Sequence, residues 1–246
     1  MESLIIDINV DTGEGIGNES QIMPYVSACN IACGGHAGDG ETMRNAVKLA
    51  KQYGVKIGAH PSFPDKENFG RTRMDISCVA LYTSIKNQIK DLVTILNEEH
   101  AALHHIKPHG ALYNLAAVDE KVANVIVEAV KALAIPVKLY VPFNSVIANV
   151  AIKNNIQIIY EAFADRNYND DLTLVSRNES NALISNSDLM FEHINNIILN
   201  KKVKTISGNF VPLKAETFCI HGDQPDGVNI VSNLVGRLKN KGIKIR

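Results

Sequence analysis

Short apolar segments rich in β-forming residues alternate with segments of helical periodicity along nearly the whole chain. The apolar segments predict strands at residues 4–10, 25–33, 55–59, 103–107, 137–141, 157–162 and 216–221. Apolar residues at every third or fourth position predict helices at 42–53, 77–99, 120–133, 144–153, 188–199 and 228–241, and the polar stretch 165–181 predicts a loop. About seven strand–helix units without a linker predict an α/β protein, a parallel β/α barrel formed as a single domain over residues 1–246.

The composition is that of an ordinary globular protein of 246 residues, 46% of them hydrophobic. Its 25 basic residues balance 26 acidic ones, so no basic stripe indicates nucleic acid and no polybasic tail indicates a membrane partner. Residues 1–10 carry two acids and no base, unlike a secretory signal. The 4 cysteines are too few and too scattered for a disulfide framework. We therefore expect a cytoplasmic protein with reduced thiols that acts on a small molecule.

Polar residues gather where the predicted strands end, which is where a parallel β/α barrel carries its catalytic groups. In the first strand, Asp7, Asn9 and Asp11 alternate with Ile8 and Val10 and so share one face. Parallel strands are usually buried on both faces, and buried carboxylates without partners are unfavourable. We therefore interpret this face as functional and expect it at the barrel mouth.

Histidines follow four of the predicted strands, and three of them stand directly before a glycine or a proline. They are His36 in C-G-G-H-A-G-D, His60 in G-A-H-P, His109 in K-P-H-G and His221 in H-G-D. Other polar residues at the same strand ends are Asn30, Lys107, Glu161, Asp165, Arg166 and Asp223. Their recurrence at one end of the strands is hard to explain by stability, whereas His100, His104, His105 and His193 are interpreted as structural.

These residue types suit two chemistries. His and Asp can act as general base and general acid, while Lys107 and Arg166 stabilise developing negative charge. Alternatively, His36, His60 and Asp11 can hold a divalent metal ion that activates water. The sequence has no GxGxxG after its first strand and no GxxxxGK[ST], so dinucleotide and P-loop sites are not indicated.

Seven sequence blocks together resemble the LamB/YcsF family. They are D-I-N-V-D-T-G-E-G-I-G, N-I-A-C-G-G-H-A-G-D, G-A-H-P-S-F-P-D, F-G-R, K-P-H-G-A-L-Y-N, E-A-F-A-D-R-N-Y and H-G-D-Q-P, in the family's order from Asp7 to Pro225. The resemblance implies a seven-stranded barrel of the glycoside hydrolase/deacetylase type. It also implies a role as the A subunit of ATP-dependent 5-oxoprolinase, which opens 5-oxo-L-proline to L-glutamate with subunits B and C.

The resemblance also implies which residues form the site. We expect catalytic roles for Asp7, Asn9, Asp11, His60, Lys107 and His109, and substrate binding by Glu14, Asn30, His36, Glu161, Asp165, Arg166, His221 and Asp223. Two stretches depart from the family pattern, V-S-R-N-E-S-N-A after the F-A-D-R motif and Asp226-Gly227 after the H-G-D motif. Neither departure touches the His and Asp set.

Two other functions stay open from the sequence. One is a metal-dependent deacetylase or amidohydrolase that acts alone, and the other is a non-catalytic subunit that delivers a ligand to partner proteins. Self-association into a homo-oligomer also stays open, as does the identity of the subunit that binds ATP.

Overall fold

Seven parallel strands close into a barrel in the computed structural model, which describes residues 4–224 and 226–246. Residues 1–3 and Pro225, the last residue of the H-G-D-Q-P motif, lie outside the described residues. The barrel strands are β1 (Ile5–Thr12), β2 (Ala28–Ala32), β3 (Lys56–His60), β4 (Leu103–Ile106), β5 (Lys138–Pro142), β6 (Gln157–Phe163) and β9 (Thr217–Ile220). They pair in this order, and β1 also pairs with β9, which closes the sheet. The predicted seven-stranded parallel barrel is confirmed.

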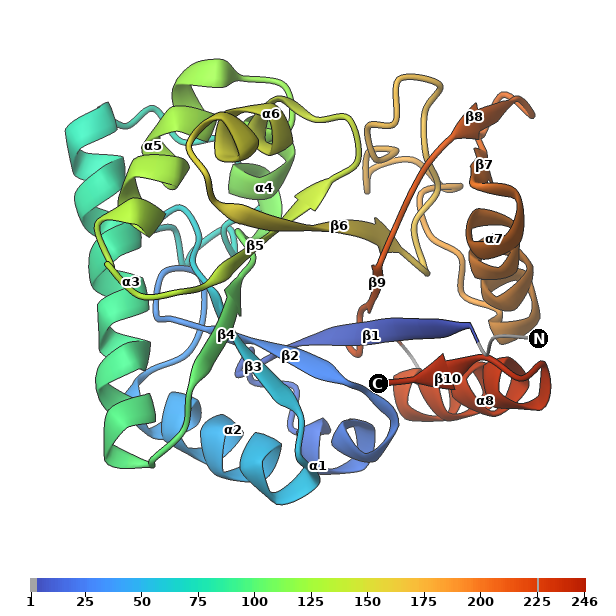
Figure 1. The fold of residues 1–246 in the computed structure, drawn as a ribbon, viewed down its shortest axis with the longest axis horizontal. Coiled ribbons are helices and arrows are strands. Elements are labelled where there is room, and N and C mark those ends of the chain that lie inside the picture. The colour runs from blue at the N-terminus through green and yellow to red at the C-terminus, as the bar shows by residue number, and fades with distance from the viewer. Residues whose placement is uncertain (1–3, 225) are drawn as a thin grey trace.

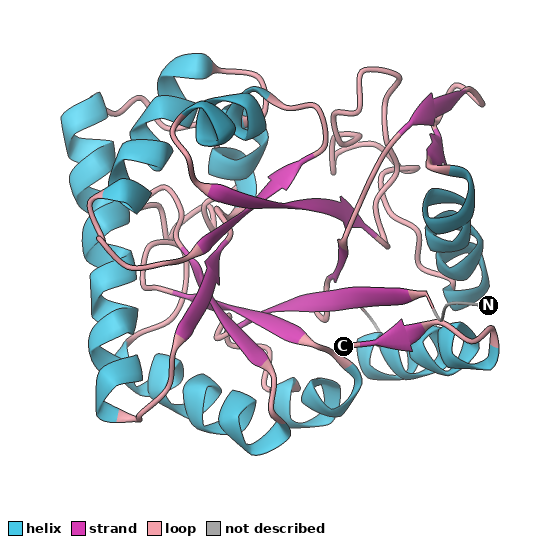
Figure 2. Ribbon diagram, viewed as in Figure 1, coloured by secondary structure: helices cyan, strands magenta, loops and turns pink. Residues whose placement is uncertain are grey.

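Helices surround the barrel on its outside (Figures 1 and 2). They are α1 (Glu19–Ile22), α2 (Gly40–Tyr53), α3 (Cys78–Glu98), α4 (Gly110–Ala116), α5 (Glu120–Lys131), α6 (Val146–Lys153), α7 (Ser187–Asn200) and α8 (Gly227–Asn240). In α2 the four apolar residues that share one face in the sequence, Met43, Ala46, Val47 and Ala50, are all buried. Asp39 begins this helix by accepting a hydrogen bond from Thr42 N at 2.9 Å, which is a standard N-cap.

Several short elements are absent from the prediction because they are too short to show a period. They are α1, α4, the 3₁₀ turn η1 (Met23–Tyr25), β10 (Lys244–Ile245), which pairs with the start of β1, and an antiparallel pair, β7 (Lys202–Lys204) with β8 (Phe210–Pro212). The second strand was predicted from residue 25, but residues 23–25 form η1 with Pro24 in its first turn instead. Among the described residues, none of the helices combines the length and the apolar character that crossing a membrane requires.

The alternation in β1 divides its side chains as predicted. Ile6, Ile8 and Val10 are buried in the apolar core of the protein. Asn9 and Asp11 lie on the other face, where they contact side chains from other barrel strands. The interior of the barrel is therefore polar at this level, and the candidate site is built on it.

Candidate active site at the carboxyl ends of the strands

A layer of hydrogen-bonded side chains inside the barrel supports the site from below. Asn9 Nδ2 donates to Glu161 Oε1 at 3.0 Å and to Thr217 Oγ1 at 2.8 Å, and Asn9 Oδ1 accepts from Asn30 Nδ2 at 2.8 Å. His105 Nε2 lies 2.7 Å from Asn30 Oδ1. These side chains come from different strands of the barrel and are all buried, so the layer fixes those strands relative to one another. Asn9 and Asn30 thus act here as supports under the cavity.

Lys107 is the centre of the next layer and is only 2% exposed. Its Nζ lies 3.1 Å from Asp11 Oδ1, 3.1 Å from Glu161 Oε1 and 2.9 Å from Cys219 Sγ. Burial alone would lower the pKa of Lys107, but the neighbouring negative charges, Asp11 first, raise it well above its usual value. Burial alone would raise the pKa of Asp11, but its interactions with His60 and Lys107 hold it well below its usual value. Lys107 is therefore a charged ammonium paired with carboxylates.

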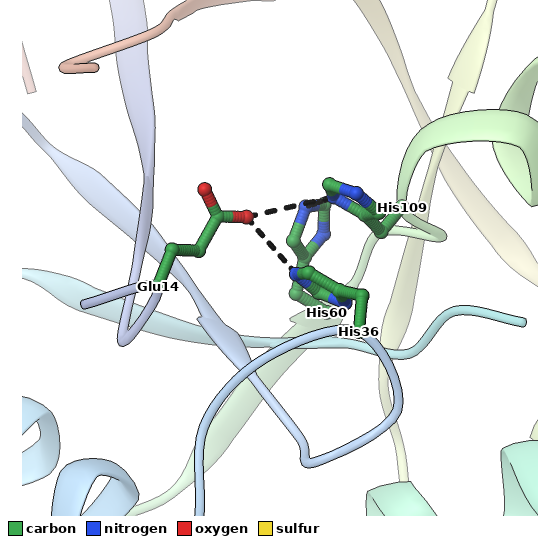
Figure 3. Close-up of side chains that lie close together, drawn as sticks. All are labelled: Glu14, His36, His60 and His109. Atoms are coloured by element: carbon green, nitrogen blue, oxygen red, sulfur yellow. Dashed lines mark hydrogen bonds and ion pairs between the residues drawn. The ribbon is translucent and has the colours of Figure 1, made fainter. Parts of the chain in front are cut away.

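Three histidines and Glu14 form a second group beside Asp11 (Figure 3). His60 Nε2 lies 3.3 Å from Asp11 Oδ2 and 3.0 Å from His109 Nδ1. Glu14 Oε1 lies 3.0 Å from His36 Nε2 and 3.5 Å from His109 Nδ1. One possible ligand atom from each of these four residues lies within 4.8 Å of the others. Of the three residues that the sequence offered for a metal ion, the structure brings His36 and His60 together with Glu14 and His109, whereas Asp11 contacts the group through His60.

His221 and Asp165 form a pair on the far side of Asp11. His221 Nδ1 lies 2.9 Å from Asp165 Oδ2, which also accepts from His221 N at 2.8 Å and from Gln224 Nε2 at 2.9 Å. A carboxylate only accepts, so Nδ1 carries the hydrogen and Nε2 is free to exchange a proton. That Nε2 lies 3.9 Å from Asp11 Oδ2. Burial alone would raise the pKa of Asp165, but its interactions with His221 lower it, so the carboxylate stays ionised to orient the imidazole.

Arg166 and Asp223 belong to the loops around the mouth. Arg166 is buried and donates from Nη2 to the carbonyl oxygen of Val175 at 2.6 Å and from Nε to that of Ala182 at 3.4 Å. Burial lowers the pKa of Arg166 to about 10. Asp223 accepts from Arg71 Nη2 at 3.2 Å. Both residues therefore hold loops in place at the edge of the site.

Asp7 does not lie at the mouth. It is bound by Lys56 Nζ, at 2.8 Å from Oδ1, and the same Nζ donates to the backbone oxygen of Arg246 at 3.0 Å. Both Asp7 and Lys56 stand near the amino-terminal ends of their strands. The expectation that Asp7 gathers with Asn9 and Asp11 at the carboxyl ends was wrong, because alternation assigns a residue to a face and leaves its height along the barrel open.

A cavity of about 510 Å³ opens above these groups. Its walls include Asp11, Glu14, His60, Lys107, His109, Arg166 and His221 from the predicted set. Tyr113, Phe163 and residues 174–178, none of them predicted from the sequence, also line it. The hydroxyl of Tyr113 and Oε2 of Glu161 are buried without a hydrogen-bond partner. Buried polar atoms rarely stay unpaired, so the hydroxyl of Tyr113, which lines the cavity, is a candidate to contact a ligand.

Two further residues of this site, Cys219 and Tyr113, were not predicted, although their spacing in the sequence indicates where their side chains lie. Cys219 stands two positions before His221 at the end of the same strand, so alternation places both side chains on the inner face. Tyr113 follows His109 by four positions at the start of α4, which brings both onto one helix face. Burial raises the pKa of Cys219 and of Tyr113 well above their usual values, so both are neutral donors.

A β/α barrel with a cavity at the carboxyl ends of its strands, lined by histidines, carboxylates and a lysine, is the architecture of a barrel enzyme for a small polar molecule. More narrowly, the chain belongs to the LamB/YcsF family, whose model matches residues 6–246. It is 40% identical over 240 residues to a Haemophilus influenzae (strain PittEE) protein named as the A subunit of 5-oxoprolinase, with 98% of each chain covered.

Two solved structures have a similar fold. The lactam utilization protein from Thermus thermophilus matches with a TM-score of 0.91 and 35% identity, over 99% of both chains. A putative cellobiose-phosphate cleavage protein from Enterococcus faecalis V583 matches with a TM-score of 0.61 at 11% identity, over 100% of this chain and 97% of that one. The second likeness concerns the fold alone.

Proposed function

We propose that this chain is the A subunit of an ATP-dependent 5-oxoprolinase, which opens the lactam of 5-oxo-L-proline to L-glutamate while ATP is hydrolysed to ADP and phosphate. The observation that carries the proposal is the cavity lined by the Lys107 ammonium, Asp11 and His221. Asp165 holds the ring of His221 from behind. The names of the Haemophilus and Thermus relatives support the substrate class. Subunits B and C are the partners that we expect.

Coupling to ATP has a chemical reason. A five-membered lactam is an unstrained amide and a poor electrophile, and its ring closure is favoured because the amine and the acid are tethered. Transfer of the γ-phosphoryl group of ATP to the amide oxygen would activate the carbon for attack by water. Collapse of the adduct would break the C–N bond and leave an acyl phosphate, which a second water would hydrolyse to L-glutamate and phosphate. The sequence carries no P-loop, so we expect other loops or the partner subunits to bind ATP.

The side chains have roles that follow from their protonation. His221 Nε2 can remove a proton from water while Asp165 holds the ring and stabilises the imidazolium that forms. Lys107 presents a positive charge to the oxygen on which negative charge develops. Asp11 lies within 3.9 Å of His221 Nε2 and 3.1 Å of Lys107 Nζ, so it can position the water between them.

The test is glutamate release from 5-oxoproline by the purified chain, with and without ATP and with and without subunits B and C. We expect ATP-dependent glutamate from the complete mixture and little or none from the isolated chain. Robust turnover by the chain alone would contradict the need for partners. No ATP-dependent glutamate from the complete mixture would contradict the proposed function itself.

The group of Glu14, His36, His60 and His109 favours a second candidate, a metal-dependent deacetylase or amidohydrolase that acts alone. That function predicts ATP-independent release of acetate or amine from amide substrates by the isolated chain.

A non-catalytic subunit that only binds a ligand makes a different prediction from either enzyme. If the chain only delivers a ligand, His221→Gln in the reconstituted complex should leave kcat for bound substrate unchanged.

A further inference from the structure

Two histidine nitrogens at the cavity face each other, and neither carries a hydrogen when both rings are neutral. His60 Nδ1 lies 2.7 Å from the carbonyl oxygen of Lys107, and because that oxygen only accepts, Nδ1 carries the ring hydrogen. His109 Nε2 lies 2.9 Å from the carbonyl oxygen of Phe69 and carries its hydrogen for the same reason. The other two nitrogens, His60 Nε2 and His109 Nδ1, are 3.0 Å apart. Their lone pairs repel unless they share a cation.

The surroundings supply the charge and the spacing that a metal ion needs. Glu14 Oε1 lies 3.5 Å from His109 Nδ1. Figure 3 marks this ion pair with a dashed line. Donor atoms at tetrahedral positions around a zinc-sized ion, with bonds of ~2.0–2.1 Å, are about 3.3 Å apart. Histidine ligands also usually donate their second ring hydrogen to a carbonyl or a carboxylate, as His60 and His109 both do.

His36 has a different place in the group. Its ring is parallel to that of His109, with centroids 3.6 Å apart and an interplanar angle of 2°. Two stacked rings cannot aim their lone pairs at one ion, so His36 is better placed to donate from Nε2 to Glu14 Oε1 at 3.0 Å. Glu14, His60 and His109 line the cavity, whereas His36 is buried behind them.

We propose that His60 Nε2, His109 Nδ1 and Glu14 Oε1 bind one divalent transition-metal ion, and that its fourth coordination position opens into the cavity. Two imidazoles and one carboxylate suit zinc or cobalt. The neighbouring group of Asp11, Cys219 and His221 is less suitable, because the Lys107 ammonium lies 2.9 Å from Cys219 Sγ and would repel a cation. Such an ion would supply a water molecule of lowered pKa beside Asp11. The site does not depend on which substrate the cavity takes.

The experiment is a titration of the metal-stripped full-length chain with Co²⁺, followed by visible absorption, and then displacement by Zn²⁺. We expect one Co²⁺ per chain with the absorption of a four- or five-coordinate site. Glu14→Gln and His109→Gln should each weaken binding at least about tenfold, the order of loss that follows removal of even an outer contact of a metal ligand. The matched control is His100→Gln, which removes an exposed histidine outside the group and should bind like the unchanged chain.

Circular dichroism of each variant verifies that it is folded, and Glu14→Gln, which lies in a loop, is the variant least able to disturb the barrel. Equal and weak Co²⁺ binding by the unchanged chain, Glu14→Gln and His100→Gln would overturn the proposal. A ¹⁵N nuclear magnetic resonance spectrum of the chain with Zn²⁺ gives a second test. A proton on His60 Nε2 in that spectrum would also overturn the proposal, because the two histidines would then share a proton and not a metal ion.

Discussion

Replacing Lys107 by methionine should greatly destabilise the protein. Methionine keeps the length and the apolar stem of the side chain, so little packing is lost. The ammonium, however, is only 2% exposed and lies 3.1 Å from both Asp11 Oδ1 and Glu161 Oε1. Without it two buried carboxylates lose their cation. Breaking a buried ion pair by removing one partner costs about 3–5 kcal/mol, and we expect a loss of this size in the free energy of unfolding.

Urea unfolding followed by circular dichroism measures this loss. A second variant, Lys107→Met with Glu161→Gln, removes one of the two unpaired charges and should recover part of the stability. Glu161→Gln alone is the control, because in it the lysine keeps Asp11 as a partner. A loss below about 1 kcal/mol for Lys107→Met, in the range of a surface ion pair, would refute the view that this charge organises the interior.

Three other predictions concern different parts of the protein. Asp11→Asn keeps an oxygen acceptor but loses the charge. It should reduce turnover of the complex by about a hundred- to ten-thousand-fold, with a smaller effect on the melting temperature. Activity within about threefold of the unchanged protein would remove Asp11 from the catalytic set. Gly58→Ala would place a Cβ atom 2.1 Å from His105 Nε2, and thermal unfolding should show a loss of about 1–3 kcal/mol in stability. The control is Gly236→Ala, whose Cβ would have no heavy atom within 4 Å and should not destabilise the protein. In a thiol titration of the native protein only Cys78, the one partly exposed cysteine, should react quickly, and rapid reaction of two or more thiols would contradict the burial of the rest.

The sequence predicted the parts of the site that depend on local pattern. Alternation placed Asn9 and Asp11 on the inner face of β1, and the end of each strand located His60, Lys107 and His221. The same reasoning was wrong for Asp7, which precedes Asp11 by four residues. At about 3.3 Å per residue, it lies roughly 13 Å further down the strand, at the opposite end of the barrel.

Contacts between distant strands could not be predicted in this way. Lys107 and Cys219 are 112 positions apart and meet because β9 closes the barrel against β1 and β6. Likewise, the tautomers of His60 and His109 depend on two backbone carbonyls that only the fold brings near them. The residue types indicated acid–base or metal chemistry, but the choice of Glu14 over His36 as a metal ligand needed ring planes and distances.

The two sides of the cavity are built differently. Its floor consists of side chains on barrel strands that hold one another by buried hydrogen bonds and ion pairs. One wall is the loop 174–178, held by the bonds of Arg166 to Val175 and Ala182. The stretch V-S-R-N-E-S-N-A, in which this chain departs from the family pattern, begins at Val175 and ends at Ala182. The departure therefore lies on the surface that a ligand in the cavity meets, and it leaves the acid–base groups in place.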